Sequence, residues 1–305
     1  MEVLASLIAT TMNAGTPLLL AALGVLVAER SGVLNLGVEG QMLMGAITGY
    51  IATVETGSFT VGFIAAILVS VALSMVFAAF AVGLRANQQA SGLAMAIFGS
   101  GLSAYIGIPY QSAVLPERMA DGIPFLCDIP VIGPALFSQH ILVYVALLMI
   151  PAISWFLFKT RAGLVLRGTG ESPESANALG YSVPGIRCAA LAFSGACIGV
   201  AGAYLSLIYT PIWVEGMVAG RGWIALALVT FGTWRPGRVF FGAYLFGGMT
   251  MLQMNLQSIG VSIPTQIISM APYAATIIVL ALMSRNPTWI RLNMPASLGK
   301  PFIPH

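Results

Sequence analysis

The sequence predicts an all-α protein that crosses a membrane several times. Of its 305 residues, 58% are hydrophobic and 8% are charged, whereas a soluble globular domain carries about 25% charged residues. Charge this sparse cannot cover the surface of a water-soluble protein of this size, and the mean hydropathy of +0.92 agrees. These values exclude a soluble enzyme, a nucleic-acid-binding protein and a disordered chain. Most of the chain is therefore expected to be surrounded by lipid.

The predicted bundle has about nine spans, with eight to ten allowed. A spanning helix needs about 20 mostly apolar residues to cross about 30 Å of hydrocarbon. The second, fourth and seventh stretches are short or polar, and the first is not expected to be a cleaved signal peptide because no basic residue precedes it. The nine stretches are Leu4–Ala28, Gly37–Val54, Thr60–Leu84, Gln89–Ile108, Gln139–Phe158, Ala189–Tyr209, Ala219–Thr233, Val239–Leu256 and Gln266–Met283.

The distribution of Lys and Arg predicts the orientation. If the loops after the odd-numbered stretches share one side, that side carries eleven basic residues: Arg30, Arg85, Lys159, Arg161, Arg167, Arg187, Arg235, Arg238, Arg285, Arg291 and Lys300. The other side carries only Arg118 and Arg221. Cytoplasmic loops are enriched in basic residues, so the N-terminus is expected outside and the C-terminus in the cytoplasm. Residues 1–305 then form one membrane domain with two long loops, 109–138 outside and 159–187 in the cytoplasm.

The sequence lacks the residues that membrane catalysis would need. It contains no G-x-x-x-x-G-K-[ST] loop for nucleotide phosphates and no H-E-x-x-H zinc motif. Its two histidines, His140 and His305, cannot build a metal centre or a catalytic triad. No carboxylate lies in the middle of a predicted span, which disfavours a proton-driven transporter. An ion-coupled secondary transporter of a small polar solute remains the alternative.

The first candidate functional segment is the entry to the second stretch, residues 29–46. Asn35 is placed to cap a helix, and Glu39 would lie in the first turn, where a negative charge meets the positive end of the helix dipole. One interpretation is a well-capped helix start. The other is a broken helix that lines a pathway, with Glu39 held by backbone amides. The candidate pathway residues here are Asn35, Glu39 and Gln41.

The second candidate segment is residues 168–180, within the 159–187 loop. Ser172 is a good N-cap, Pro173 a good first helical residue, Glu174 falls in the first turn, and Gly180 suits the C-terminus. These signals predict a helix of about two turns. Such a short helix is not stable alone, so it is either a capped connector or a helix that rests against the bundle or a partner.

Three amides along the eighth stretch are further pathway candidates. Gln253, Asn255 and Gln257 alternate along the chain. Amides can hydrogen-bond a hydroxylated solute such as a sugar without the cost of a buried charge. They can equally bond neighbouring helices.

At residues 34–46, Leu-Asn-Leu-Gly-Val-Glu-Gly-Gln-Met-Leu-Met-Gly-Ala, the chain resembles a known family. The segment is similar to the signature of ABC-importer permeases of the ribose and branched-chain amino acid type, and within them to the nucleoside and simple-sugar branch. Residues 16–24, 31–35 and 87–94 match that branch as well, so the resemblance covers most of the chain. It implies a permease subunit that translocates a nucleoside or a simple sugar.

The cytoplasmic segment 174–180 resembles the E-A-A-x-x-x-G loop of ABC permeases. Glu174, Ala176 and Gly180 match this loop, and Ser175 replaces an alanine, whereas the downstream I-x-L-P part is not recognisable. In the family this loop presents a short coupling helix to a cytoplasmic ATPase. The resemblance therefore assigns contact with an ATPase to Glu174, Ala176 and Gly180, and Glu171, just before this segment, is a further candidate for the same contact.

The resemblance also implies the partners. They are a second permease subunit, an ATPase that binds ATP and magnesium, and a periplasmic or lipoprotein solute-binding protein. The chain itself would hold no cofactor and catalyse no reaction, and it would lie in the inner (cell) membrane of a bacterium. Arg118 and Arg221, the external basic residues, are candidates to meet acidic groups of the binding protein.

Overall fold

The computed structural model describes residues 2–116, 137–258, 293–303 and the single positions 270, 274, 277 and 278, and every regular element among them is a helix. Eight of the nine predicted stretches overlap helices, and the ninth falls largely outside the described residues. The helices are α1 (Glu2–Arg30), α2 (Val38–Thr56), α3 (Phe59–Ala78), α4 (Gln88–Gly107), α5 (Ile141–Lys159), α6 (Arg161–Glu171), α7 (Pro173–Ala178), α8 (Val183–Tyr204), α9 (Arg221–Phe231) and α10 (Pro236–Ser258). A π-helical turn continues α3 (η1, Ala79–Gly83) and another continues α8 (η4, Leu205–Tyr209), while a 3-10 turn, η2 (Ile108–Tyr110), follows α4.

Among the described residues, five segments are long and apolar enough to cross a membrane. They are Ser6–Arg30, Phe59–Gly83, Gln88–Tyr110, Ile141–Lys159 and Val183–Tyr209. This finding confirms a helical protein with several apolar spans; the total of nine and the orientation stay predictions. The segments differ in burial, because α1 and α8 are mostly enclosed by other helices whereas α3, α4 and α5 expose most of their apolar length.

Small residues bring the central helices together, as the spacing of Gly45, Gly49, Gly199 and Ala203 indicates. A Cβ added at Gly45 would lie 2.9 Å from Gly199, and one at Gly49 would lie 3.0 Å from the Cβ of Ala203. Both contacts join α2 to α8, while α3 packs across the same surface. Close backbone approach of this kind holds helices together in lipid, where the hydrophobic effect between helices is weak.

Two helices begin inside the bundle and not at its ends. The third residue of α2, Gly40, packs so tightly that an added Cβ would lie 2.6 Å from the carbonyl oxygens of Met95 and Ala96, near the middle of α4. Helix α9 has 11 residues and is about 17 Å long, roughly half of a 30 Å hydrocarbon layer. The seventh predicted stretch is therefore not a continuous span: the irregular segment 210–220 precedes a half-length helix.

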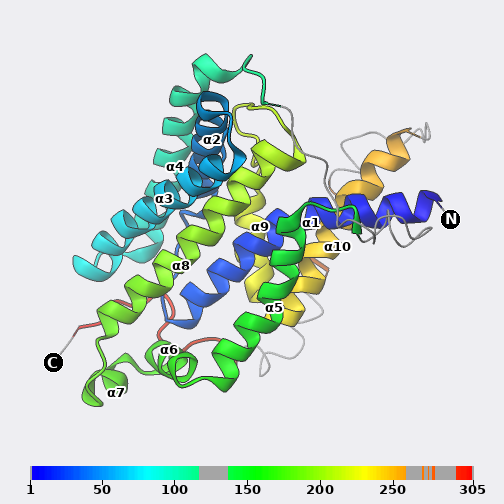
Figure 1. The fold of residues 1–305 in the computed structure, drawn as a ribbon. Coiled ribbons are helices and arrows are strands. Elements are labelled where there is room, and N and C mark those ends of the chain that lie inside the picture. The colour runs from blue at the N-terminus through cyan, green and yellow to red at the C-terminus, as the bar shows by residue number, and fades with distance from the viewer. Residues whose placement is uncertain are drawn as a thin grey trace.

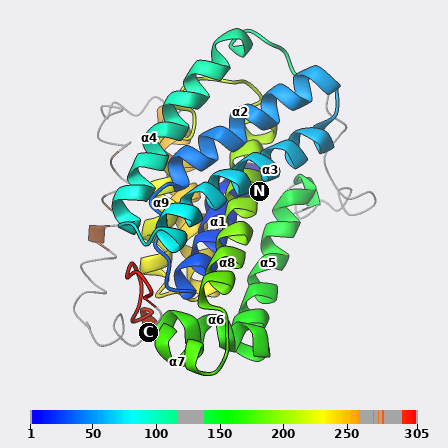
Figure 2. The ribbon, with the colours of Figure 1, turned by 90° about the vertical axis from the view of Figure 1, so that its left-hand side faces the viewer.

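Helices α6 and α7 lie at one end of the bundle, beside the C-terminal segment, and the turn between α2 and α3 lies at the other end (Figure 1; Figure 2). The sequence predicted one short helix in the 159–187 loop. The structure adds α6 before it and shows that most of the loop is helical.

Candidate functional site: a helix junction and a coupling segment

Glu39 joins the starts of α2 and α9. Its Oε1 accepts a hydrogen bond of 2.8 Å from the amide of Gly220, and its Oε2 accepts one of 2.7 Å from the amide of Gly222. The carboxylate thus satisfies free amides at the N-terminus of α9, where the helix dipole is positive. Glu39 lies in the first turn of α2, as predicted, and backbone amides hold it; they belong to a segment about 180 residues away in the chain.

Glycines make this junction possible. Gly220 has a φ of +82°, a conformation that residues with a Cβ rarely adopt. Gly222 lies so close to Glu39 that an added Cβ would be 2.6 Å from the backbone nitrogen of Glu39. We call the set Glu39, Gly220 and Gly222 the helix junction. Discontinuous helices whose N-termini meet inside the membrane are typical of transporter binding sites.

Asn35 and Gln41 lie beside the helix junction and contact each other. The expectation that Asn35 caps α2 is wrong in position, because Gly37 is the N-cap and no side chain caps it. Instead the Oδ1 of Asn35 accepts a hydrogen bond of 2.8 Å from the amide of Gly37, and its Nδ2 donates to the Oε1 of Gln41 at 3.3 Å. Gln41 is fully buried, and its Nε2 has no hydrogen-bond partner in the described part of the chain.

Arg221 is turned towards its own loop. One guanidinium nitrogen donates hydrogen bonds to the carbonyl oxygens of Met217 at 3.0 Å and Val218 at 3.2 Å, and the guanidinium lies 5.6 Å from the ring centre of Tyr209. These contacts fix the segment before α9 and so support the helix junction. Arg118, the other predicted docking residue, lies outside the described residues.

The three predicted amides of the eighth stretch lie on α10. Gln253, Asn255 and Gln257 fall within its last two turns, and their side chains lie outside what the structure describes. Their proposed contact with a solute stays a prediction.

The predicted short helix is confirmed as α7. The Oγ of Ser172 accepts a hydrogen bond from the amide of Ser175 at 3.3 Å, and Pro173 is the first helical residue. Glu174 lies in the first turn and is exposed, whereas Ala176 is buried against Val183 and Phe302. Gly180 follows the helix with a φ of +86°, and nothing lies within 4 Å of the position of a Cβ there.

The exposed side of this segment carries apolar side chains. Leu179 is 77% exposed and Tyr181 is 45% exposed, on either side of Gly180. Exposed apolar side chains at the end of a short helix are typical of a surface that binds another protein. We call α6, α7 and residues 179–182 the coupling segment.

The C-terminal residues 293–303, which we call the strap, tie the coupling segment to the bundle. The amide of Ser297 donates to the carbonyl oxygen of Gly170 at 3.0 Å, and its Oγ donates to the same oxygen at 2.7 Å. The amide of Ala296 donates to the Oε2 of Glu171 at 3.4 Å. Phe302 completes the contact by packing on Ala176 of α7. Sequence reasoning missed the strap because its residues show no helical or strand periodicity.

Two buried arginines connect the strap to the end of α1. Arg187 of α8, only 1% exposed, donates to the carbonyl oxygens of Ser31 and Lys300, each at 3.3 Å. Arg30 donates to the carbonyl oxygen of Trp234 at 2.9 Å and to that of Asn293 at 3.1 Å. The coupling segment and the chain that leads from α1 into the helix junction are therefore joined by continuous hydrogen bonding.

Glu29 anchors the far end of α9 at the same place. Its Oε2 accepts a hydrogen bond of 2.6 Å from the indole nitrogen of Trp234, and both side chains are buried. Thr233 and Trp234 have φ values of +49° and +52°, a costly backbone conformation for residues with a side chain. Adjacent Glu29 and Arg30 at the end of an apolar stretch are the sequence signal that could have found this contact.

Replacing Gly170 tests how tightly α6, to which the strap is bonded, packs against the end of α1. A Cβ at Gly170 would lie 2.2 Å from the carbonyl oxygen of Arg30, whereas one at Gly168, on the same helix, would meet nothing within 4 Å. We expect Gly170→Ala to lower the free energy of unfolding by about 1–3 kcal/mol. Gly168→Ala should be neutral or raise it by about 0.5–1 kcal/mol. Thermal unfolding of the two purified variants measures the difference, and equal midpoints would contradict a tight contact.

Comparison with known proteins identifies the family. Residues 7–284 match the model of the family described as "Branched-chain amino acid transport system / permease component". The chain belongs to this family. It is 38% identical to a putative glucose ABC transporter permease protein of Haloferax volcanii, over 98% of this chain and 97% of that protein. No solved structure matches the chain.

Two further relatives carry nucleoside names. The chain is 34% identical to a nucleoside ABC transporter permease protein of Lactococcus lactis, over 90% of this chain and 91% of that one. It is 32% identical to a guanosine ABC transporter permease protein of Bacillus subtilis, over 99% of this chain and 98% of that protein. The family resemblance of residues 34–46 is thus confirmed, and the chain is an ABC-type permease.

Proposed function

We propose that the chain is the membrane-spanning permease subunit of an ATP-driven importer that moves a nucleoside or a simple sugar. The observation that carries the proposal is the full-length similarity to permeases named for glucose, nucleosides and guanosine. These solutes share a hydroxylated ring, which amide side chains can hydrogen-bond without a buried charge. The candidates to do so are Asn35 and Gln41, beside the helix junction, and Gln253, Asn255 and Gln257 on α10.

The coupling segment would be the part of the chain that the ATPase subunit moves. In this proposal an ATPase subunit contacts Glu171, Glu174 and Gly180, and closure of that subunit around ATP and magnesium displaces α7. Ala176, the fourth residue predicted for this contact, is buried against Val183 and Phe302 and so acts from the inner side of α7. Ala176 supports α7 from its buried side, while Glu174 and the apolar tip face outward. The strap and the two buried arginines would transmit the displacement towards α1 and the helix junction.

The helix junction would respond by separating or rotating the starts of α2 and α9. The carboxylate of Glu39 on α2 accepts hydrogen bonds from two amides at the start of α9, and these bonds hold the two helix starts in one arrangement. Its release would change the packing between α2 and α9. Only interactions that differ between two states can shift their populations, and in this proposal the two bonds of Glu39 are made in one state and lost in the other.

The proposal includes the remaining partners and the location. A second permease subunit and a solute-binding protein would complete the importer, the binding protein would dock through Arg118 and Arg221, and no nucleic acid takes part. The N-terminus would face outside and the coupling segment the cytoplasm of a bacterial cell, as the basic residues predict. In the structure four of these residues, Arg30, Arg187, Arg235 and Lys300, gather at the same end as α6 and α7.

Competitive uptake tests the substrate. Cells that express the chain with its ATPase, second permease and binding protein should accumulate a labelled nucleoside or sugar, and unlabelled guanosine, ribose and glucose should compete in an order that names the class. ATP depletion should stop uptake. Uptake that persists without the ATPase subunit and collapses with an ionophore would instead support the ion-coupled alternative.

Purified chain alone should hydrolyse no ATP. The sequence contains no phosphate-binding loop, so hydrolysis is assigned to the partner subunit. Phosphate release is measured for the lone chain in lipid vesicles and again after the ATPase subunit is added. Hydrolysis by the lone chain above that of empty vesicles would contradict this division of labour.

A further inference from the structure

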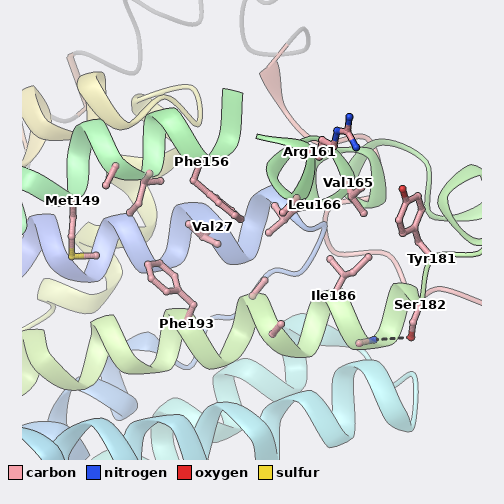
Figure 3. Close-up of a pocket in the computed structure, with 16 residues that line it drawn as sticks. Val27, Met149, Phe156, Arg161, Val165, Leu166, Tyr181, Ser182, Ile186 and Phe193 are labelled. Carbon is pink, nitrogen blue, oxygen red and sulfur yellow. Dashed lines mark hydrogen bonds between the residues drawn. The ribbon is translucent and has the colours of Figure 1, made fainter. Parts of the chain in front are cut away.

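An apolar groove of about 880 Å³ opens on the side of the bundle between α5, α6 and α8, with α1 at its floor (Figure 3). Its volume falls within the roughly 300–1,000 Å³ of ligand-binding pockets. Several lining residues, Ala152 and Ala189 among them, are exposed, so the groove is open to the surroundings of the bundle.

Polar groups gather at one end of the groove. Met149 and Phe193 lie at the apolar end, whereas Arg161, Tyr181 and Ser182 lie at the other (Figure 3). Among the described residues that line the groove, none is acidic. A ligand that fits this arrangement has a long apolar part and a negatively charged head.

The Arg161 guanidinium is free to bind a negatively charged headgroup. Its side chain is exposed, and within the described residues no hydrogen bond or ion pair engages its guanidinium. By contrast, Arg167 on the same helix lies 5.0 Å from the ring centre of Phe158, and Arg187 is buried among carbonyl oxygens. The N-terminus of α8 lies at the same end, where Ser182 caps it by accepting a hydrogen bond of 3.3 Å from the amide of Gly185, and the positive end of the helix dipole there favours an anion.

The surface around the groove is apolar, which places the groove in the bilayer. Leu148 is 70% exposed and Trp155 is 64% exposed on α5, and Leu164 is 61% exposed on α6. Exposed apolar surface marks contact with lipid or with another protein, and lipid is the partner expected along α5, which is long and apolar enough to cross a membrane. The polar end of the groove lies where α5 ends and α6 begins, at the level expected for lipid headgroups.

We propose that this groove binds an anionic phospholipid, with an acyl chain against α5 and α8 and the headgroup phosphate at Arg161. Basic pockets between helices at the membrane surface bind anionic headgroups in this way. The bound lipid would contact α6 directly and so would adjoin the coupling segment. The assignment concerns binding and holds whichever solute the protein moves.

Lipid retention tests the proposal without any measurement of transport. The full chain is reconstituted in vesicles of equal parts phosphatidylglycerol and phosphatidylcholine and re-extracted in mild detergent, and the lipids that remain bound are counted by native mass spectrometry. We expect the protein to retain phosphatidylglycerol in preference to phosphatidylcholine. Arg161→Gln and Arg161→Glu should each reduce that retention about fivefold or more, the effect of one basic residue at an anionic surface.

Two further variants control the result. Arg85→Glu makes the same charge change at an exposed position between η1 and α4, outside the groove, and should retain the lipid as the original chain does. Ala189→Trp fills the groove and should lower retention although every charge is kept. Equal retention of both lipids, or unchanged retention in both Arg161 variants, would overturn the proposal. So would a photoreactive group at position 189 that crosslinks to residues 266–283 of the same chain and not to lipid.

Discussion

Replacing Glu39 by glutamine should reduce solute uptake at least about tenfold, the factor that corresponds to about 1.4 kcal/mol. The Glu39 carboxylate accepts two amide hydrogen bonds, from Gly220 and Gly222. Glutamine keeps the size but can accept at only one atom, and its amide group then faces an N–H that it cannot bond. The loss of stability should stay within about 1–3 kcal/mol, the usual worth of a hydrogen bond to a charged group.

The matched control is Glu55→Gln, at the other end of α2. Glu55 is exposed and accepts a hydrogen bond of 2.9 Å from the hydroxyl of Tyr110, so the same chemical change there should leave uptake near its original level. Uptake per folded protein and the thermal unfolding midpoint are measured for both variants. If Glu39→Gln lowers only the midpoint, Glu39 is a helix-capping residue and has no role in the pathway.

Charge changes on the coupling segment should separate ATP hydrolysis from transport. Glu174 is exposed in the first turn of α7, and Gly180 adopts a left-handed conformation at its end. Glu174→Lys reverses a charge at the proposed contact with the ATPase, where a like-charge pair costs several kcal/mol. We expect uptake to fall at least about tenfold, while the assembled transporter still hydrolyses ATP and the chain remains folded.

Gly180 offers a pair of variants that differ in charge alone. Aspartate and asparagine have nearly the same shape, and both tolerate the left-handed conformation of this position better than other residues with a Cβ. Gly180→Asp should therefore impair uptake more than Gly180→Asn, and Glu174→Gln should be milder than Glu174→Lys. Normal uptake by both Glu174→Lys and Gly180→Asp would remove the coupling role.

Local signals explain what the sequence predicted correctly. The short helix α7 was predicted from Ser172, Pro173 and Gly180, because caps and turns depend on residues that are neighbours in the chain. The apolar stretches predicted eight of the helices for the same reason. The family was recognised from residues 34–46, and the comparisons confirm it.

Features that depend on distant contacts were not predicted. The partners of Glu39 at Gly220 and Gly222 could not be found, since no local pattern links these positions. Asn35 was placed as a cap, but it bonds Gly37 and Gln41, which moves the helix start to a glycine. The strap was missed because backbone atoms supply most of its hydrogen bonds, and any sequence supplies those atoms.

Helix α6 was missed for a different reason. Its sequence, residues 161–171, contains three glycines in eleven positions, and glycine is unfavourable in a helix interior by about 1 kcal/mol. Gly163 and Gly170 are required by close contacts with the backbone of Phe156 and Arg30. Packing therefore overrides propensity at these two positions.

The accessibility of the coupling segment tests the account most directly. Ser175→Cys, in a chain whose three native cysteines are replaced by serine, places a thiol on the exposed side of α7. Thr56→Cys, at the opposite end of the bundle, is the control. A membrane-impermeant maleimide should label position 56 in intact cells and position 175 only in inside-out vesicles, where bound ATPase subunit should protect it. Labelling of position 175 from outside intact cells would contradict both the coupling role and the orientation.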